Sequence, residues 1–340
     1  FRNAGTLYVA ASGEGQDSFG LVDTSGTIRN ISNAGTWIAA LGTNNTEGNA
    51  VAIDVRVNTS GVKLLNQGTI TGDIWLGSGS DTVTLVDGEL DGDIRFGAGD
   101  DRLIIQDNAI FSGGLSHEGT LDLTLSGADL ILGTNDEFNV TTANLEGDST
   151  LYFSVDPLQG KSGLFTATGA VVIGKDVAIT PLFQTFVVEE HSYELLEAGS
   201  LTLGGDLDTP LLDNQSFMID ASLALNESGD QIILTVRPKT AEELSLSGNK
   251  AVIYDGLFDG IDPSDDLGSA LASLDSAEAV DNAMEVLLPD TTNAMFQMAY
   301  SGVRQLEATL GDRLIETTAR RRLNGGFWAR EVVGYGTADI

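Results

Sequence analysis

The sequence contains no cysteine, only 6 prolines and only 2 histidines among its 340 residues. The absence of cysteine excludes disulfide frameworks, thiolate zinc sites and cysteine nucleophiles. It also suits a chain that crosses a membrane unfolded, because a premature disulfide would block threading. A catalytic triad or a histidine metal site would need His117 or His191, and each stands beside a glutamate among residues typical of polar turns. We therefore predict no catalytic residue and no enzymatic activity for this chain.

Positive charge and long apolar stretches are also scarce. The 17 Lys and Arg residues against 50 Asp and Glu residues give a net charge of −33. An acidic surface repels nucleic acid, so we predict no nucleic-acid partner. The absence of any long apolar run excludes a membrane-spanning helix. The basic residues of the first 130 positions are too spread along the sequence to predict a cleft; they are Arg2, Arg29, Arg56, Lys63, Arg95 and Arg102.

Short sequence repeats dominate the first third of the chain. The form Asn-x-Gly-Thr begins at Asn3, Asn33 and Asn66, and apolar residues follow each copy. A tighter repeat aligns residues 72–83 with residues 92–103 at a constant offset of 20. Its apolar residues recur two apart, which places them on one face of a strand. The repeat predicts coils of about 20 residues stacked at roughly 4.8 Å as a right-handed parallel β-helix, with an antiparallel sandwich as the alternative.

The turn of each repeat is rich in glycine and aspartate. Residues 77–81 and 97–101 resemble single units of the calcium-binding repeat Gly-Gly-x-Gly-x-Asp. Stacked coils would bring aspartates within about 5 Å of each other, and a hard cation would relieve their repulsion. The opposing interpretation is a β-corner in which aspartate binds backbone amides, since the copies do not run in tandem at nine residues. The candidate calcium ligands are Asp73, Asp81, Asp93, Asp100 and Asp101; no other cofactor is predicted.

The strand pattern continues to about residue 240, with turn signals between apolar pairs. Three segments, 150–157, 164–171 and 192–199, resemble the C-terminal end of autotransporter passengers. In that family this region caps the β-helix and seeds its folding outside the cell, the so-called autochaperone. A cap is physically needed, because a stack of coils ends in open strand edges that recruit other chains.

The composition changes after Pro238, where Ala, Leu, Glu and Asp replace Thr and Gly. Thr240 and Glu243 have the spacing of a capping box, and short helices are predicted near 247–258, 265–273 and 276–288. Apolar residues at helical spacing predict a long helix within 291–322. The segment 327–336 then reads as a strand with aromatic residues near both ends. This order is similar to the autotransporter junction, where a lumenal helix leads into the outer-membrane barrel.

These observations predict a mainly β chain that is a fragment, since its last strand is cut short at Ile340. A right-handed parallel β-helix with a β cap would be followed by short helices, one long helix and a truncated barrel strand. The expected domains are β-helix coils at 1–134, an autochaperone-like cap at 135–240, a helical linker at 241–290, a lumenal helix at 291–323 and the start of the barrel at 324–340.

The resemblance implies a non-catalytic stem and translocation-coupling segment at the cell surface. Its implied partners are the outer membrane, reached through the missing barrel, the barrel-assembly machinery and periplasmic chaperones. Two alternatives are an acidic adhesin solenoid that binds calcium and a polysaccharide-cleaving β-helix enzyme. The sequence identifies neither a host ligand nor the role of a missing N-terminal passenger.

Overall fold

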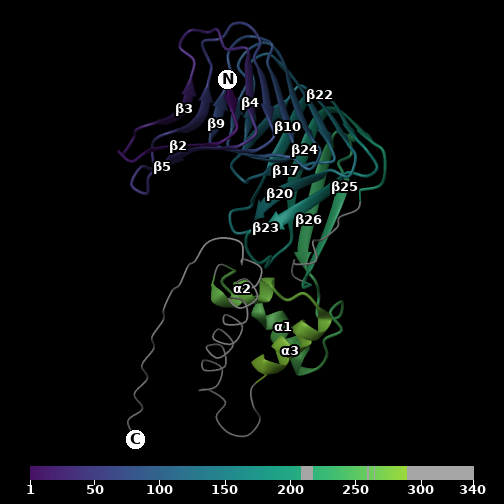
Figure 1. Cartoon of the computed structure of the whole chain (residues 1–340). Helices are drawn as coiled ribbons and strands as arrows, with labels where there is room; N and C mark the ends of the chain where they lie inside the picture. Colours follow the sequence, from purple (N-terminus) through teal and green to yellow (C-terminus); the bar gives the residue numbers. More distant parts are fainter. Residues whose placement is uncertain (208–216, 259, 264, 289–340) are drawn as a thin grey trace, which may run out of the picture.

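The computed structural model describes residues 1–207, 217–258, 260–263 and 265–288. Stacked parallel strands form most of it, and three short helices lie together beyond one end of the stack (Figure 1). No helix in these ranges is both long and apolar enough to cross a membrane. The predicted lumenal helix at 291–323 and the barrel start at 324–340 lie outside the described residues.

A sheet of 9 strands forms one side of the stack. Its strands pair in parallel from coil to coil, except for a short antiparallel strand at its end. We call this series the second track, because it follows the first strand in each coil. Its members are β2 (Thr6–Ala11), β5 (Thr36–Leu41), β8 (Thr69–Thr71), β11 (Glu89–Asp91), β14 (Ile110–Ser112), β17 (Asp129–Leu132), β20 (Thr150–Asp156) and β23 (Ala178–Phe183), with β21 (Lys161–Ser162) antiparallel to β20.

A sheet of 17 strands holds the two other tracks, which merge at β22 (Leu164–Ile173). The first track consists of β1 (Arg2–Asn3), β4 (Asn30–Asn33), β7 (Lys63–Asn66), β10 (Thr82–Val86), β13 (Asp100–Gln106), β16 (Thr120–Ser126) and β19 (Thr142–Glu146). The third track consists of β3 (Ser18–Val22), β6 (Ala50–Asp54), β9 (Asp73–Trp75), β12 (Ile94–Arg95), β15 (Leu115–Ser116) and β18 (Glu137–Val140).

The observed register follows the sequence repeats. Ile74 pairs with Ile94 and Val83 with Leu103, at the predicted offset of 20. Parallel pairing in these tracks excludes the antiparallel sandwich for the first coils and fits a β-helix. The handedness of the coils stays a prediction.

The Asn-x-Gly-Thr copies also stack, so that Asn3 pairs with Asn33 and Asn33 with Asn66. The Nδ2 of Asn3 donates to Asn33 Oδ1 at 2.7 Å, and the Nδ2 of Asn33 donates to Asn66 Oδ1 at 2.8 Å. We call these three residues the asparagine ladder. The glycine of the motif is required by close approach, because a Cβ on Gly35 would lie 2.1 Å from the carbonyl oxygen of Gly5.

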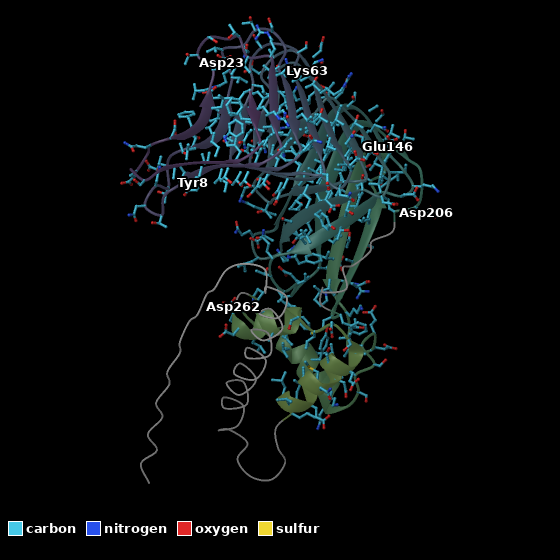
Figure 2. All side chains as sticks on the ribbon, in the orientation of Figure 1. Tyr8, Asp23, Lys63, Glu146, Asp206 and Asp262 are labelled. Atoms are coloured by element: carbon cyan, nitrogen blue, oxygen red, sulfur yellow. The ribbon has the colours of Figure 1, made fainter. Side chains whose placement is uncertain are left out.

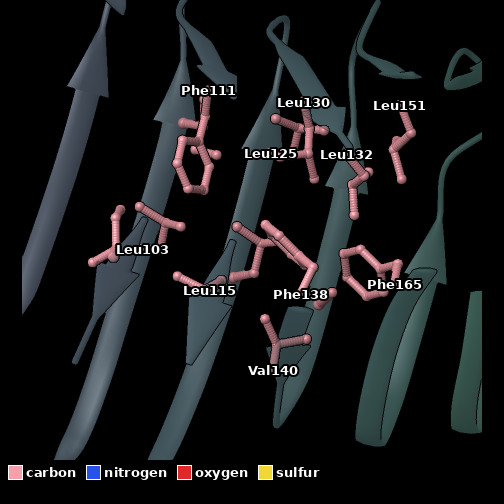
Figure 3. Packing of buried hydrophobic residues seen from close by; sticks show 14 of the residues in the cluster. Leu103, Phe111, Leu115, Leu125, Leu130, Leu132, Phe138, Val140, Leu151 and Phe165 are labelled. Atoms are coloured by element: carbon pink, nitrogen blue, oxygen red, sulfur yellow. The ribbon is translucent and has the colours of Figure 1, made fainter. Parts of the chain in front are cut away.

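The interior of the stack is one continuous apolar cluster (Figure 3). Strand residues two apart point inward, and the same position in the next coil carries another apolar side chain. Phe138 illustrates the packing, with its ring centroid 6.1 Å from that of Phe111 and 5.0 Å from that of Phe165. All three rings are buried, and truncation of one to alanine would cost about 3 to 5 kcal/mol.

The pairing changes from parallel to antiparallel at the C-terminal end of the stack. Strand β24 (His191–Leu203) pairs in parallel with β22 and antiparallel with β26 (Gln231–Pro238). Strand β25 (Ile219–Leu225) then pairs antiparallel with β26. The three segments that carry the family resemblance are therefore strands β20, β22 and β24. The antiparallel layer of β24, β26 and β25 is named the terminal hairpin layer below.

The helices α1 (Asn249–Leu257), α2 (Asp266–Ala272) and α3 (Ala277–Leu287) lie within the three predicted helical segments. They share a second apolar cluster, which includes Tyr254 and Leu271 and also Phe186 and Met218 from the β region. The helices therefore pack against the end of the stack. The capping-box bonds between Thr240 and Glu243 form, at 2.7 and 3.3 Å, but they stabilise a turn rather than the helix that such a box normally begins.

Candidate functional site

Three successive corner loops lie on one side of the stack, and three of the five predicted acidic residues, Asp81, Asp100 and Asp101, lie in or directly after them. The loops lead from the third track to the first, between β9 and β10, between β12 and β13, and between β15 and β16. Glycine permits the sharp turn, and Gly97 and Gly99 both have positive φ, at +73° and +133°. The inner side of the corner carries carboxylates, and its outer side borders an open cleft.

Asp81 and Asp101 point into the stack at equivalent positions of adjacent coils. The Oδ1 of Asp81 accepts the Val62 amide at 2.6 Å, and the Oδ1 of Asp101 accepts the Asp81 amide at 2.7 Å. Each carboxylate thus replaces a ladder hydrogen bond to the preceding coil. Both side chains are buried, at 1% and 3% exposure, and neither Oδ2 has a hydrogen-bond partner among the described residues.

Burial disfavours the charged form of both carboxyl groups. It raises the pKa of Asp81 to about 6, although the hydrogen bond from the Val62 amide opposes the shift. Burial raises the pKa of Asp101 to about 7, and the charges of Asp81 and Asp100 add to the shift. A proton is therefore held on this pair at a pH where ordinary aspartates are ionised.

The other predicted ligands face elsewhere. The Oδ1 of Asp73 accepts the Asp93 amide at 3.1 Å, and the Oδ1 of Asp93 accepts the Gly114 amide at 2.8 Å. These two carboxylates therefore bind the following coil, whereas Asp81 and Asp101 bind the preceding one. Burial also raises the pKa of Asp73.

Asp100 is exposed and its Oδ1 accepts the Thr120 hydroxyl at 2.8 Å. Within the described residues, no group of three or more Asp, Glu, His or Cys side chains is placed to hold a metal ion. The arrangement matches the β-corner interpretation, in which aspartates bind backbone amides, except that Asp81 and Asp101 are buried rather than solvated. Calcium binding at the five aspartates stays a prediction.

The two histidines occupy different settings. His117 lies in the corner loop after β15, where its Nδ1 is 2.8 Å from the Gly119 carbonyl oxygen. His191 is the first residue of β24 rather than a turn residue, and its Nε2 lies 3.2 Å from Glu189. No hydroxyl nucleophile has been found hydrogen-bonded to either ring among the described residues.

The outer side of the corner is an open cleft of about 550 Å³. Arg56 and Arg95 meet there over Trp75, with their guanidinium carbons 4.1 and 5.1 Å from the ring centroid. The prediction that the basic residues are too spread to form a cleft is therefore wrong for this pair. The cleft is lined by Arg56, Leu76, Gly77, Ser78, Arg95, Gly97, Ala98, Ser116, His117 and Glu118.

The repeat alignment contained part of the signal for this cleft, because the offset of 20 places Trp75 opposite Arg95. Arg56 has no equivalent in that alignment. It lies just after β6, whose pairing with β9 contains a register shift between Val51 and Ile53. The shift displaces the numbering by one residue, so only the folded coils bring Arg56 beside Trp75.

Comparison with protein families, curated proteins and solved structures gives no match to this chain.

Proposed function

We propose that this chain is the non-catalytic stem and translocation-coupling segment of a surface-exposed autotransporter. In this role it seeds the folding of the passenger and links it to an outer-membrane pore. The observation that carries the proposal is the terminal hairpin layer, which closes the C-terminal end of a stack of parallel coils. The acidic, cysteine-free composition supports export of the chain in an unfolded state.

A closed end can act as a template for folding. The first half of β24, from His191 to Glu197, pairs antiparallel with β26, and its second half, from Leu196 to Leu203, pairs in parallel with β22. Strand β24 therefore joins the terminal hairpin layer to the preceding coil. Strand β26 buries Ile232, Leu234 and Val236 completely, and these side chains extend the apolar cluster of the stack into the terminal hairpin layer. The hairpin of β25 and β26 forms from local contacts such as Leu225 with Ile232, which lie closer in sequence than the residues that pair between coils, such as Ile74 and Ile94. A chain that emerges C-terminus first would therefore fold this layer first and add coils to it.

The helical region is coupled to the same layer. Arg237 at the end of β26 forms ion pairs with Asp220 of β25 at 2.6 Å and with Glu243 at 2.8 Å. The second apolar cluster is next to these ion pairs, since it includes Met218, close to Asp220 in the sequence, and Leu244, which follows Glu243. This connection is what a segment needs if it transmits the position of a pore-bound helix to the stem.

The folding role is tested with two matched truncations. Leu234→Ala removes a buried side chain from the terminal hairpin layer, and Ile31→Ala removes one of the same size from the first coils. We expect Leu234→Ala to slow the refolding of the whole stack from urea, measured by far-UV circular dichroism. Ile31→Ala should leave the refolding rate near that of the parent protein. Equal slowing by both, or slowing by Ile31→Ala alone, would contradict a C-terminal seed.

The cellular role is tested by location. The full-length protein should fractionate with the outer membrane, and residues 1–240 should be cleaved by protease added to intact cells. The pattern of fragments should match that of the purified protein. Recovery of the protein in the cytosol alone would refute the proposal.

A second candidate function, an acidic adhesin solenoid that binds calcium, is favoured by the unpartnered Oδ2 atoms of Asp81 and Asp101. A cation between them would supply the missing partner. Millimolar calcium should then raise the melting temperature of the parent protein but not that of the Asp81→Asn/Asp101→Asn variant. If both proteins respond equally, calcium acts elsewhere and this candidate fails.

A further inference from the structure

We propose that the cleft outside the corner loops binds an acidic oligosaccharide, and that Arg95 binds the carboxylate of this ligand. The inference is independent of the proposed stem function, because it concerns the outer surface of the coils rather than their terminal layer. Side chains that end in oxygen or nitrogen project from the outside of the stack (Figure 2), and the cleft is distinguished by two arginines in a strongly acidic protein.

Arg95 is the cation that remains available to a ligand. Arg56 is already bound, because its Nε and Nη2 donate to Asp54 at 2.9 and 2.8 Å. Arg95 has no ion pair within 4.0 Å in the described part of the chain, and its charge acts on Asp73 only at longer range. A free guanidinium presents paired N–H donors with the spacing of a carboxylate.

The position of Arg95 is fixed from both sides. Its backbone pairs with Trp75 in one neighbouring coil and with Ser116 in the other. The indole of Trp75 packs under both guanidinium groups and is itself buried, with the ring of Phe19 at 6.0 Å on its edge. A charged group held against a rigid ring loses little further freedom when a ligand binds, which favours affinity.

The remainder of the cleft suits a hydroxylated ligand. The volume of about 550 Å³ lies in the range of ordinary small-molecule sites. Ser78 and Ser116 contribute hydroxyls, and Gly77 and Gly97 complete the lining without side chains. The Nδ1 of His117 lies 2.8 Å from the Gly119 carbonyl oxygen, which only accepts, so Nδ1 is the donor of that bond and Nε2 is not used by it.

The charge of the protein limits the charge of the ligand. Glu118 borders the cleft, and the net charge of −33 repels highly charged polymers. A nucleic acid or a densely sulfated glycan is therefore disfavoured. A sugar with one carboxylate, or with a few, fits the single available guanidinium.

The inference is tested by calorimetric titration of the whole 340-residue protein at low ionic strength. The probes are sialyllactose and digalacturonate, each compared with its uncharged methyl ester. We expect at least one acid to bind and its ester to bind about tenfold more weakly, which corresponds to the loss of one charge-assisted contact. Arg95→Gln should weaken binding of the acid about tenfold and leave binding of the ester unchanged.

The matched control is Arg102→Gln, which removes the same charge from an exposed arginine on β13, the first-track strand that follows β12. It should leave the affinity unchanged, and both variants should keep the melting temperature of the parent protein. Absence of binding by either acid, equal binding of the ester, or equal weakening by Arg102→Gln would overturn the proposal. Full displacement of the sugar by equimolar sulfate would also overturn it, because the cleft would then recognise inorganic anions alone.

Discussion

The asparagine ladder and the Asp81–Asp101 pair both bury polar side chains, but only the ladder satisfies their hydrogen-bonding groups. Both place polar side chains inside the stack at equivalent positions of successive coils. In the ladder, each amide both donates and accepts, so the buried Asn33 uses its Nδ2 and its Oδ1. In the acidic pair, each carboxylate accepts one backbone amide and leaves its Oδ2 without a partner among the described residues.

The difference follows from donor and acceptor chemistry. An amide is self-complementary along a stack, whereas an ionised carboxylate only accepts and repels the next one. The ladder can therefore be buried at little electrostatic cost, and the acidic pair is buried at the expense of a raised pKa. The first arrangement stabilises the stack at any pH, and the second makes the stability of the corner depend on pH.

The largest expected effect comes from turning the ladder into an acidic site. Asn33→Asp removes the Nδ2 that donates to Asn66 Oδ1 and buries a carboxylate among oxygen acceptors. We expect a loss of about 3 to 5 kcal/mol of stability, measured as a lower urea midpoint. Asn144→Asp, at an exposed position on β19, is the control and should cost little. Equal losses of stability from the two changes would show that the hydrogen bonds of the asparagine ladder do not stabilise the stack.

The reverse change should stabilise the acidic pair. Asp101→Asn keeps an Oδ1 that can accept the Asp81 amide and removes the buried charge. At pH 8, in the absence of calcium, we expect a gain on the order of 2 kcal/mol, and the same direction for Asp81→Asn. Urea unfolding monitored by circular dichroism measures it. A loss of stability at pH 8 would mean that the carboxylates are ionised and compensated in the native state.

The pH dependence of stability gives a sharper form of the same test. Because the pKa values of Asp81 and Asp101 are raised to about 6 and 7, their contribution is fully present below about pH 4. It is lost as the pH rises through 6 to 7. The stability difference between the parent protein and Asp81→Asn/Asp101→Asn should therefore be small at pH 4 and reach its full size by pH 8. A difference that does not change with pH would contradict the shifts.

The smallest effect on stability is expected for Asp100, the exposed residue next to Asp101. Asp100→Asn changes an exposed carboxylate that accepts only the Thr120 hydroxyl. The free energy of unfolding should change by less than about 0.5 kcal/mol at any pH between 4 and 8. A change as large as that of Asp101→Asn would mean that burial is not what separates the two residues.

The repeats made much of the fold predictable. The offset of 20 gave the pairing of Ile74 with Ile94, and the recurrence of Asn-x-Gly-Thr indicated the stacked corners. The three short helices also lie within their predicted segments, because apolar spacing and the Gly and Pro stops are local signals. The capping box at Thr240 was recognised, but a local motif cannot say whether the turn it begins continues as a helix.

The candidate sites were less predictable, because they depend on which residues the coils bring together. The sequence placed Asp81 and Asp101 on adjacent coils but did not show that both side chains point inward. Arg56 and Arg95 are 39 residues apart, since 95 − 56 = 39, and no local pattern connects them. Their approach depends on coil length and on the register shift in β6.

By itself, the sequence determined a stack of strands and its coil period, because stacking makes equal positions of each repeat into neighbours. Only the tertiary structure decided which carboxylates are buried, which arginine of the cleft has no acidic partner among the described residues and how the C-terminal edge is closed. Those properties depend on solvent exclusion and on contacts between positions that share no repeat, and periodicity carries no information about either.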